Sequence, residues 1–450
     1  MYSLVKGTHD VVLDEASQFT YVEQLLSKVA EQYGYHEFRT PIIEYTELFL
    51  RSVGDSSDIV RKEMYTFQDK GDRSITLRPE ITAGTIRSMV CEKLFVNQDF
   101  PVKAYYVGPC FRYERPQQGR YRQFNQFGVE CAGVSSPYRD AETIVMAYSQ
   151  LQMLGFKNLE LKINSLGDAE SRENYKKALK DFFASSISNM CEDCQERYKL
   201  NVLRILDCKV PEDQEIVKKA PKMGDYLTEN AKKDFNTLLK ILDDNEVKYS
   251  IDDGLVRGLD YYSGVVFEFH YTSKEGKNYG AIGAGGHYSN LIAEIGGPSV
   301  EGVGYAMGIE RLVAVMNDDH LFDEINRNDL FLDAYVMPIG EENIDYAFNV
   351  TNYIRDNGFN ADICLENKSM GQMFKKATRR NSTFGIIIGS EEVQNKEVVL
   401  KDLSEQKQIK VKIEDLIDKL DELLGVEEEH EHEHECHCGC GCECKDKKEE

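Results

Sequence analysis

The sequence predicts an α/β protein with an α+β core and a separate, compact α/β domain towards its C-terminal end. Strand-like alternation dominates up to Glu130 and returns at Val265–Tyr271 and Gly280–Ala284, as expected of strands with one buried face. Residues 169–242 are charged and helical in pattern, which indicates an inserted helical module. After Asn328, strand and helix patterns alternate, and this order predicts a largely parallel sheet.

Local patterns predict the individual elements. Helices are expected over residues 14–34, over Asp140–Leu154 and, after a glycine-rich run, from Ala306 onwards. A strand is expected over Tyr35–Glu44, at a sheet edge or interface because of Pro41. The C-terminal part predicts, in order, a strand at Phe331–Ile339, a helix at Glu342–Asn357, a strand at Ala361–Leu365, a helix at Ser369–Arg380, a strand at Phe384–Ile388, two further strands and a final helix at Glu414–Leu424.

Length and composition indicate two or three globular domains, with 450 residues of which 41% are hydrophobic. No apolar run reaches the roughly 20 residues that span a bilayer, and the N-terminus lacks the pattern of a signal peptide. We therefore expect a cytoplasmic protein without membrane contact. Seven cysteines lie before the C-terminal tail, and without a secretory signal they do not suggest a disulfide framework.

A local excess of arginine stands out against the formal net charge of −24. Arg112, Arg115, Arg120 and Arg122 are interleaved with aromatic rings, and the flanking residues predict two antiparallel strands around a Pro-Gln-Gln-Gly turn. Guanidinium groups beside aromatic rings suit phosphates and flat bases. A solvated basic hairpin would explain this segment on its own equally well. The net charge does not exclude a nucleic-acid partner, because binding depends on local patches.

The glycine-rich run Gly302–Arg311 is not a dinucleotide fingerprint. Its third glycine lies four residues after the second instead of three, and a glycine- and proline-rich stretch precedes it. No Walker A motif occurs in the sequence, so bound ATP would not use a P-loop. Two explanations remain open: a close backbone approach leading into a helix that presents Arg311, or glycines packed tightly under a sheet.

Several motifs together resemble a known family. Thr40–Glu44, Phe111–Glu130 and Gly302–Arg311 are similar to the three signature motifs of class II aminoacyl-tRNA synthetases. Leu255–Tyr262 and Ala284–Tyr288 resemble the two peptides peculiar to histidyl-tRNA synthetases, and Leu77–Glu80 and Arg120–Phe124 resemble that family's other active-site segments. The resemblance covers residues 1–425. It implies an antiparallel catalytic sheet with flanking helices, a helical insertion and a C-terminal α/β anticodon-binding domain.

The resemblance also implies how ATP binds and what the enzyme makes. L-Histidine and ATP would form histidyl-adenylate and pyrophosphate, and a ribose hydroxyl of tRNA would then take the histidyl group and release AMP. Arg112 would hold the α-phosphate, Arg311 the γ-phosphate and one adenine face, and Phe124 the other face. Glu114 would position the adenine edge, and Mg²⁺ would neutralise the β- and γ-phosphates. Arg120 is assigned to ATP, although it and Arg122 would equally suit the tRNA end.

The implied histidine site pairs groups with the amine, carboxylate and imidazole of the substrate. The α-amino group would meet Glu80, Thr82 and Gln126. The imidazole would meet Glu130 and Tyr261, and Tyr262 and Tyr288 would close the pocket. Arg257 would bridge the substrate carboxylate and the α-phosphate as a catalytic cation together with Arg112; a salt bridge to Asp260 is its structural alternative.

Two residues depart from the family pattern, and one basic helix is ambiguous. His287 stands where the family has arginine, which puts the role of that charge in doubt. Ile81 replaces a glycine and would narrow the amino-group pocket. The basic side chains of the predicted helix at 369–380 suit either a solvated face or tRNA phosphates; they are Lys375, Lys376, Arg379 and Arg380.

Two cysteine-rich segments raise the question of metals. Cys191, Cys194 and Cys208 offer three ligands with no nearby histidine, so buried thiols explain them better than zinc, and we expect no metal in the core. The tail from Glu427 has no Leu, Ile, Val or Phe and is expected to be disordered. Its four histidines and five cysteines would chelate zinc or copper, whereas a solvating acidic tail is the alternative; the cysteines are Cys436, Cys438, Cys440, Cys442 and Cys444.

We therefore expect a homodimeric histidine–tRNA ligase whose partners are tRNA, L-histidine and ATP. The predicted domains are a catalytic domain at 1–328 with an insertion at about 169–250, an anticodon-binding domain at 329–425 and a tail at 426–450. Pro41 and its strand would contribute to the dimer interface. The alternative is a regulatory relative that binds histidine without charging tRNA; such relatives typically lack the C-terminal domain.

Overall fold

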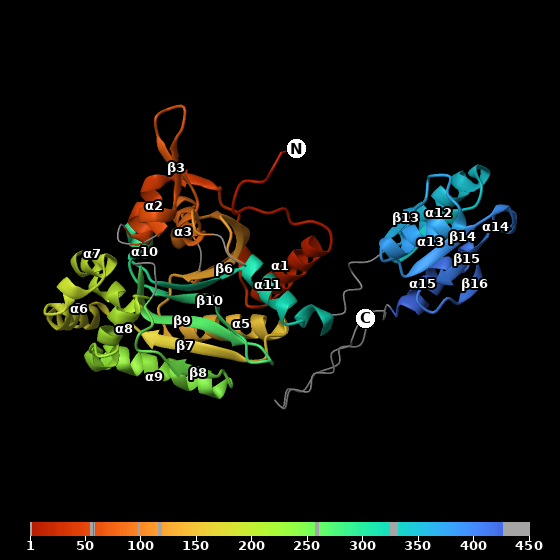
Figure 1. The fold of residues 1–450 in the computed structure, drawn as a ribbon. Coiled ribbons are helices and arrows are strands. Elements are labelled where there is room, and N and C mark those ends of the chain that lie inside the picture. Colours follow the sequence, from red (N-terminus) through yellow and green to blue (C-terminus); the bar gives the residue numbers. More distant parts are fainter. Residues whose placement is uncertain are drawn as a thin grey trace, which may run out of the picture. The chain divides into compact units, whose positions relative to one another are not determined.

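The computed structural model describes residues 2–54, 57, 59–97, 100–115, 119–256, 261–324 and 332–425. The chain divides into two compact units, Met1–Ile325 and Asn326–Glu450, which are drawn together in Figure 1. Over the described ranges, none of the helices combines the length and the apolar character that crossing a bilayer requires. The first unit contains the pockets described below.

An eight-stranded sheet forms the centre of the first unit (Figure 1). Its strand order is β1-β5-β6-β11-β10-β9-β7-β8. The two outermost pairs, β1 with β5 and β7 with β8, are parallel, and the neighbours between them are antiparallel. The strands are β1 (His36–Glu37), β5 (Val102–Phe111), β6 (Gln123–Ala132), β7 (Leu159–Ser165), β8 (Tyr249–Ile251), β9 (Tyr262–Thr272), β10 (Asn278–Tyr288) and β11 (Gly302–Gly308).

The sheet has one apolar face and one polar face at its centre. Helices α1 (Asp14–Gln32), α5 (Pro137–Met153) and α11 (Ile309–Asp318) share a buried core with the strands. Side chains of a strand alternate between the two faces. In β6, Phe127 and Val129 enter that core, whereas Gln126 and Glu130 line a pocket. The alternation of β6 therefore separates the residues that stabilise the fold from the residues of the candidate site.

The prediction of a single strand at Tyr35–Glu44 is wrong, because two separate strands form there. The structure has β1 in the large sheet and β2 (Ile43–Tyr45) in a separate three-stranded sheet of order β2-β4-β3, so each piece is an edge strand. Pro41 lies between the two pieces and has no N–H for a sheet ladder, which explains why pairing is interrupted there. The other strands of the small sheet are β3 (Tyr65–Gln68) and β4 (Ser74–Leu77).

The strands expected up to Glu130 are interrupted by helices that the sequence analysis did not predict, although strands still hold more of the described residues from Tyr35 to Glu130. Helices occupy much of this region: α2 (Thr46–Val53), the π-helix η1 (Ile59–Glu63), α3 (Thr82–Cys91) and α4 (Leu94–Asn97). In α3, Gly84 and several β-branched residues weaken the local helix signal. Tertiary packing overrides this weak helix signal. At Gly84 the helix lies so close to its neighbours that a Cβ there would be 3.3 Å from Thr40 and 3.4 Å from Glu44.

The helical insertion has its own core. Its elements are α6 (Ala169–Phe183), η2 (Ile187–Asn189), α7 (Glu192–Leu200), η3 (Val202–Asp207), α8 (Pro211–Val217), η4 (Met223–Tyr226) and α9 (Glu229–Asp244). Tyr175, Phe183 and Ile205 pack together in a cluster separate from the central core, and α6, α7 and α8 lie at one end of the large sheet (Figure 1). The helix expected from Ala306 begins three residues later, because β11 continues to Gly308; α10 (Leu291–Glu294) and η5 (Leu321–Glu324) complete the unit.

The second unit contains a five-stranded sheet of order β13-β12-β14-β15-β16. Only the pairs of β12 with β13 and β14 are parallel; the last two pairs are antiparallel, so the predicted largely parallel sheet is mixed. Strands β14 and β15 are joined by only a short helix, α14, instead of a long crossover helix, which is why they pair in the antiparallel sense. The elements are β12 (Ala334–Pro338), η7 (Glu341–Asn343), α12 (Ile344–Asp356), β13 (Ala361–Ile363), α13 (Met370–Arg379), β14 (Phe384–Ile388), α14 (Ser390–Asn395), β15 (Glu397–Asp402), β16 (Gln408–Lys412), η8 (Ile413–Asp415) and α15 (Leu416–Leu424).

Candidate active site

Seven residues that the sequence analysis assigned to amino-acid binding line one pocket of about 130 Å³, which we call the inner pocket. They come from α3 and its N-terminal approach, from β6, and from β9 and β10 with the residue before β9. The seven are Glu80, Thr82, Gln126, Glu130, Tyr261, Tyr262 and Tyr288. Residues far apart in the sequence therefore meet on the polar face of the sheet.

Two buried carboxylates dominate the electrostatics of the inner pocket. Glu130 accepts hydrogen bonds from the hydroxyls of Tyr106 (3.0 Å) and Tyr288 (2.8 Å). Glu80 accepts from the backbone N–H of Ala83 at 3.0 Å. Burial raises the pKa of Glu130 to about 8, and the neighbouring Glu80 charge contributes to this rise; burial also raises the pKa of Glu80. A pocket with two such groups favours a ligand that brings cationic or N–H donor groups.

Aromatic rings form one wall of the inner pocket. The Tyr261 ring lies 4.6 Å from that of Tyr262 and 5.9 Å from that of Tyr288, measured between centroids. Tyr261 and Tyr288 are buried. Glycine leaves the space for this arrangement, because a Cβ on Gly304 would lie 2.2 Å from the Glu130 carboxylate and one on Gly302 would lie 2.5 Å from the Tyr288 ring.

A larger, open cleft of about 500 Å³ adjoins the inner pocket. Arg112, Gln126, Ala284 and Ala306 line both spaces, so the two form one continuous site. All five residues assigned to ATP from the sequence line the cleft, namely Arg112, Glu114, Arg120, Phe124 and Arg311. The glycine run forms strand β11 of the sheet itself instead of packing under it, and α11, which follows directly, presents Arg311 to the cleft.

Arg112 occupies the junction of the two spaces. Its Nε donates to the carbonyl of Pro79 at 2.8 Å, and its guanidinium lies over the Phe124 ring at 5.2 Å from the centroid. A carboxylate oxygen of Glu114 lies 3.8 Å away. These contacts hold the guanidinium in place before a ligand arrives, which favours bidentate binding of an anion.

The remaining hairpin arginines differ in their surroundings. Arg122 lies over the Tyr113 ring at 3.8 Å and donates to backbone carbonyls, so its role is structural in this conformation. The Arg120 side chain is 59% exposed and lies 4.0 Å from Glu114. Burial and the nearby Arg120 charge lower the pKa of Arg311. Four arginines line the cleft, Arg204 of the insertion among them. Such a concentration of positive charge, in which Arg120 and Arg311 repel each other, favours a polyanionic ligand.

The cleft also includes residues that the sequence analysis missed. Arg204 and Asp207 of η3 and Glu268 of β9 line it, and Tyr106 supports Glu130 in the inner pocket. Glu268 lies on β9 and Tyr106 lies on β5. Their positions could have been predicted from strand alternation, because every second residue of a strand faces the same side of the sheet. Arg204 and Asp207 carry no such signal, because only the packing of the insertion brings them to the cleft.

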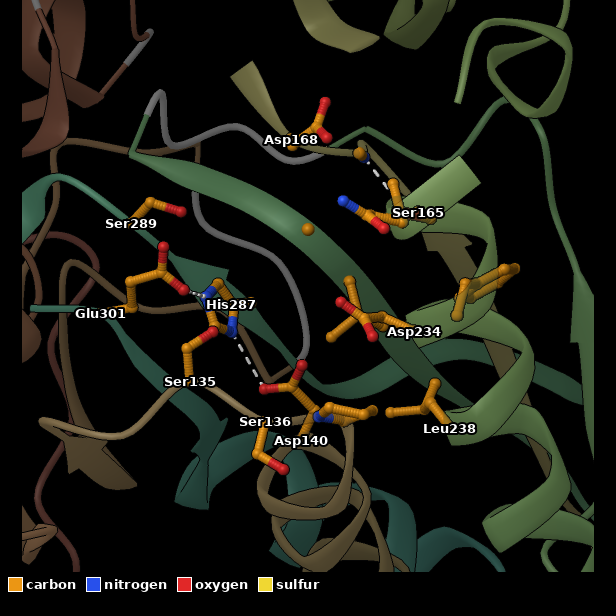
Figure 2. A pocket seen from close by; sticks show the side chains of 17 residues that line it. Ser135, Ser136, Asp140, Ser165, Asp168, Asp234, Leu238, His287, Ser289 and Glu301 are labelled. Atoms are coloured by element: carbon orange, nitrogen blue, oxygen red, sulfur yellow. Dashed lines mark hydrogen bonds and ion pairs between the residues drawn. The ribbon is translucent and has the colours of Figure 1, made fainter. Parts of the chain in front are cut away.

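The two departures from the family pattern leave the inner pocket intact. Ile81 is buried with Tyr106, Cys110 and Phe124 and is not among the residues that line the inner pocket. His287 points to the opposite side of β10 from Tyr288. Its Nδ1 lies 3.0 Å from Asp140 and its Nε2 lies 2.9 Å from Glu301, as Figure 2 shows.

His287 lines a second cavity of about 320 Å³ with its two carboxylate partners and with Asp234 and Leu238 of α9 (Figure 2). Burial alone would lower the pKa of His287, but Asp140 and Glu301 raise it to about 10. The hydrogen bond from His287 lowers the pKa of Glu301 to about 2. A protonated histidine therefore supplies a buried cation between these two carboxylates.

Replacing His287 with glutamine is expected to destabilise the first unit by about 3 kcal/mol near pH 6, because two partly buried carboxylates lose their cation. The pKa is raised from its ordinary value of 6.5 to about 10, so this contribution is complete below about pH 6.5 and is lost as the pH rises through 10. Urea unfolding followed by circular dichroism at pH 6 and pH 9.5 measures the difference.

His287→Arg is the matched control for this experiment, because it keeps a cation and is expected to recover most of the lost stability. An unfolding difference between wild type and His287→Gln that stays constant from pH 6 to pH 9.5 would contradict the charged histidine.

Other assigned residues lie elsewhere. Arg257 and the tail cysteines 436–444 lie outside the described residues. The basic residues of 375–380 lie on α13 and at its C-terminal end. Lys376 pairs with Glu366 at 2.6 Å and Arg380 pairs with Asp362. In the described part of the chain, no carboxylate lies within ion-pair distance of Lys375 or Arg379.

An antiparallel sheet with an arginine-lined cleft beside a small acidic pocket is the arrangement of a class II aminoacyl-tRNA synthetase. A histidyl-tRNA synthetase family model matches residues 7–312, and an anticodon-binding domain matches residues 333–423. The chain belongs to the histidyl-tRNA synthetase family. This confirms the resemblance inferred from the motifs and the predicted fold class.

Individual relatives agree with this assignment. A histidine–tRNA ligase of Thermosipho melanesiensis is 45% identical over 412 residues, which are 91% of this chain and 96% of the relative. One from Bacillus subtilis is 43% identical over 92% of this chain and 97% of the relative. The crystal structure of apo histidyl-tRNA synthetase from S. aureus matches with a TM-score of 0.79 at 35% identity, over 93% of this chain and all of that one.

Proposed function

We propose that this protein joins L-histidine to its tRNA at the expense of ATP. The observation that carries the proposal is the inner pocket with its two buried carboxylates, which opens directly into the arginine-lined cleft. One space suits an amino acid with an amine and an imidazole, and the other suits a nucleoside triphosphate. The carboxylate of histidine would thereby face the α-phosphate at Arg112.

Histidine is held by hydrogen bonds and charge. Glu80, Thr82 and Gln126 bind the α-amino group, and Glu130 and Tyr261 bind the imidazole. Tyr262 and Tyr288 enclose the ring. Removing a hydrogen-bonding group from a ligand leaves buried polar atoms of the site unpaired, which costs about 10⁴–10⁵ in specificity, so selection against other amino acids needs no editing step.

ATP is held by the cleft. Arg112 contacts the α-phosphate, Arg311 the γ-phosphate and one adenine face, and Phe124 the other. Glu114 meets the adenine edge and Arg120 closes the rim. Mg²⁺ prefers oxygen ligands, and the Glu268 carboxylate on the cleft wall together with phosphate oxygens would supply them. The ion would neutralise phosphate charge.

The chemistry is positioning plus electrostatics. The histidine carboxylate attacks the α-phosphorus, the bond to the β-phosphate oxygen breaks, and pyrophosphate leaves. A terminal ribose hydroxyl of tRNA then attacks the histidyl carbonyl and AMP leaves. Arg112, and Arg257 by resemblance to the family motif, stabilise the negative charge on the phosphate and carboxylate during the first step.

The domain limits and the assembly belong to the same proposal. The catalytic domain spans 1–328 with its insertion at about 169–250, and the anticodon-binding domain spans 329–425. The protein forms a homodimer through β2 and the residue before it, where Ile43 and Tyr45 of the strand and the preceding Ile42 are exposed; apolar exposure of this kind marks contact surfaces. Sedimentation equilibrium gives the mass in solution.

Histidine-dependent exchange of labelled pyrophosphate into ATP, followed by charging of histidine tRNA, tests the proposed function. We expect both reactions with histidine and neither with other amino acids. Histidine binding without exchange would favour the regulatory alternative. The match of the anticodon-binding domain at 333–423 favours the ligase, because such regulatory relatives typically lack this domain.

Lys375 and Arg379 are proposed to contact tRNA phosphates together with Lys376 and Arg380. The double substitution Lys375→Ala/Arg379→Ala is expected to raise KM for tRNA about tenfold and to lower the salt dependence by about one unit of slope per lost contact. Pyrophosphate exchange should not change, because it needs no tRNA. Charging assays between 50 and 200 mM salt measure both effects.

Lys419→Ala is the control, since Lys419 pairs with Glu422 on α15 at 2.5 Å and is not assigned to tRNA. Equal effects of the double variant and of this control on KM for tRNA would exclude a specific contact by α13.

A further inference from the structure

Three cysteines and one aspartate of the helical insertion converge on one point. Cys191 precedes α7, Cys194 lies in its first turn, Cys208 follows η3, and Asp213 lies in the first turn of α8. One ligand atom from each residue lies within 4.8 Å of the ligand atoms of the other three. The sequence analysis identified only the three cysteines as candidate ligands, and the fold brings Asp213 to them as a fourth.

The distances fit a tetrahedral ion. The Sγ atoms of Cys191 and Cys208 are 3.9 Å apart, and Sγ of Cys208 is 3.4 Å from Oδ2 of Asp213. Zinc–sulfur bonds of about 2.3 Å and zinc–oxygen bonds of about 2.0 Å place ligand atoms of a tetrahedron about 3.8 Å (S to S) and about 3.5 Å (S to O) apart. Two of the six ligand pairs therefore already stand at the spacing of a zinc site, and the other ligand atoms lie within 4.8 Å of one another.

The surroundings of Asp213 point to a missing cation. Cys194, Cys208 and Asp213 are buried, and the Asp213 carboxylate accepts a hydrogen bond from the backbone N–H of Cys191 at 3.0 Å. Among the described residues, no basic side chain forms an ion pair with Asp213. A buried carboxylate without a counter-charge is costly, and a divalent ion between it and the three sulfurs would supply that charge.

We propose that Cys191, Cys194, Cys208 and Asp213 form a structural zinc site. Three thiolates and one carboxylate complete a closed four-coordinate set, which is the pattern of structural zinc, and soft sulfur ligands disfavour magnesium or calcium. The sequence analysis expected no metal here because it looked for a nearby histidine as the fourth ligand, and an aspartate five residues after Cys208 takes that position instead.

The site joins the segments that form one wall of the cleft. It links α7 and α8 to the end of η3, and η3 contributes Arg204 and Asp207 to the cleft. On the other side, α7 pairs with η1 through Glu196 and Arg61 at 2.5 Å and through Asp193 and Lys62 at 3.3 Å. Zinc would therefore fix the position of this wall, a consequence that rests on the proposed ATP site.

Metal content of the full chain tests the site once the tail is prevented from binding metal. In a parent variant, the five tail cysteines are changed to serine and the four tail histidines to asparagine, and the protein is purified, dialysed and analysed by inductively coupled plasma mass spectrometry. We expect about one zinc per chain in this parent and a loss of at least tenfold for Cys194→Ser and Asp213→Asn. The matched control is Cys364→Ser, a buried cysteine of the second unit, which should keep its zinc.

Cobalt substitution keeps the test decisive if a ligand variant fails to fold. The parent variant, stripped of zinc and loaded with Co²⁺, should show the thiolate charge-transfer and tetrahedral d–d absorption bands, and adding Zn²⁺ should bleach them and raise the unfolding temperature. Absence of zinc and of these bands in the parent would overturn the proposal, as would a Cys191–Cys208 disulfide found by mass spectrometry.

Enzyme kinetics provides a separate readout. Stripping zinc from the parent is expected to raise KM for ATP in pyrophosphate exchange at least tenfold, with restoration by added Zn²⁺. Unchanged KM for ATP on removal of one bound zinc would overturn the role at the cleft wall. The zinc content is measured without any enzymatic reaction. The zinc site can therefore be tested even if the proposed function is wrong.

Discussion

Replacing Arg112 with alanine is expected to lower kcat/KM for pyrophosphate exchange by about 10²–10³, or roughly 2.7–4 kcal/mol of transition-state stabilisation. Arg112 is placed where the inner pocket and the cleft meet, so its guanidinium would face the charge that develops as the histidine carboxylate attacks. Arg112→Lys should recover little, because lysine is a point charge without the planar fork.

Arg120→Ala is the matched control for Arg112. It removes the same charge from the same hairpin, but its side chain is exposed at the rim, where a single ion pair contributes little, and we expect less than a tenfold loss. Circular dichroism excludes unfolding as the cause, since Arg112 also donates to Pro79. A loss for Arg120→Ala as large as that for Arg112→Ala would contradict the assignment of the α-phosphate to Arg112.

Replacing Glu130 with glutamine is expected to lower kcat/KM for histidine at pH 9 by about 10²–10³, with little change in KM for ATP. The substitution preserves the shape of the side chain but removes the buried charge that would accept the imidazole N–H. The expected loss equals about 3–4 kcal/mol, within the range for removing one partner of a buried charged contact. Steady-state pyrophosphate exchange with histidine as the varied substrate measures the effect.

The pKa of Glu130 predicts in which direction kcat/KM for histidine changes with pH. Burial raises the pKa of Glu130 to about 8, so the carboxylate that accepts the N–H is formed only as the pH rises through about 8. In the wild type, kcat/KM for histidine should therefore increase between pH 7 and pH 9, and the Glu130→Gln variant should lack this increase. A wild-type profile that falls over this range would contradict the role of Glu130.

A methylated substrate separates ring recognition from general damage. Histidine methylated on the ring nitrogen that donates to Glu130 should be a poor substrate for the wild type, and the difference between the two substrates should shrink in Glu130→Gln. Glu80→Gln serves as the comparison: it should weaken binding of both substrates equally, because Glu80 is assigned to the α-amino group that both share.

Much of the site was predictable because its residues lie in continuous motifs. Two glutamates and three tyrosines of the inner pocket and three of the four arginines of the cleft were assigned from local segments, and the structure brings each of these described groups into one of two adjoining spaces. The physical reason is the strand period of two, which places Gln126 and Glu130 on the same face of β6.

Other features depend on contacts between distant segments. The helices α2 and α3 were missed because their apolar and β-branched residues resemble a strand locally, and packing overrides weak propensity. The orientation of Ile81 and His287 away from the inner pocket follows from their neighbours in space, which sequence spacing does not reveal. Asp213 joins the three cysteines for the same reason.

The sequence by itself determined the family, the α/β class, the order of the main elements and the residue types that the chemistry requires, because these are properties of local patterns and of whole motifs. Tertiary structure alone decided that Asp140 and Glu301 keep His287 protonated, that η3 of the insertion forms a wall of the cleft, and that Asp213 completes a set of four ligands. Each of these features depends on charges or atoms that are far apart in the sequence and close in space. Their interaction energies depend on distance and burial, which position along the chain does not give.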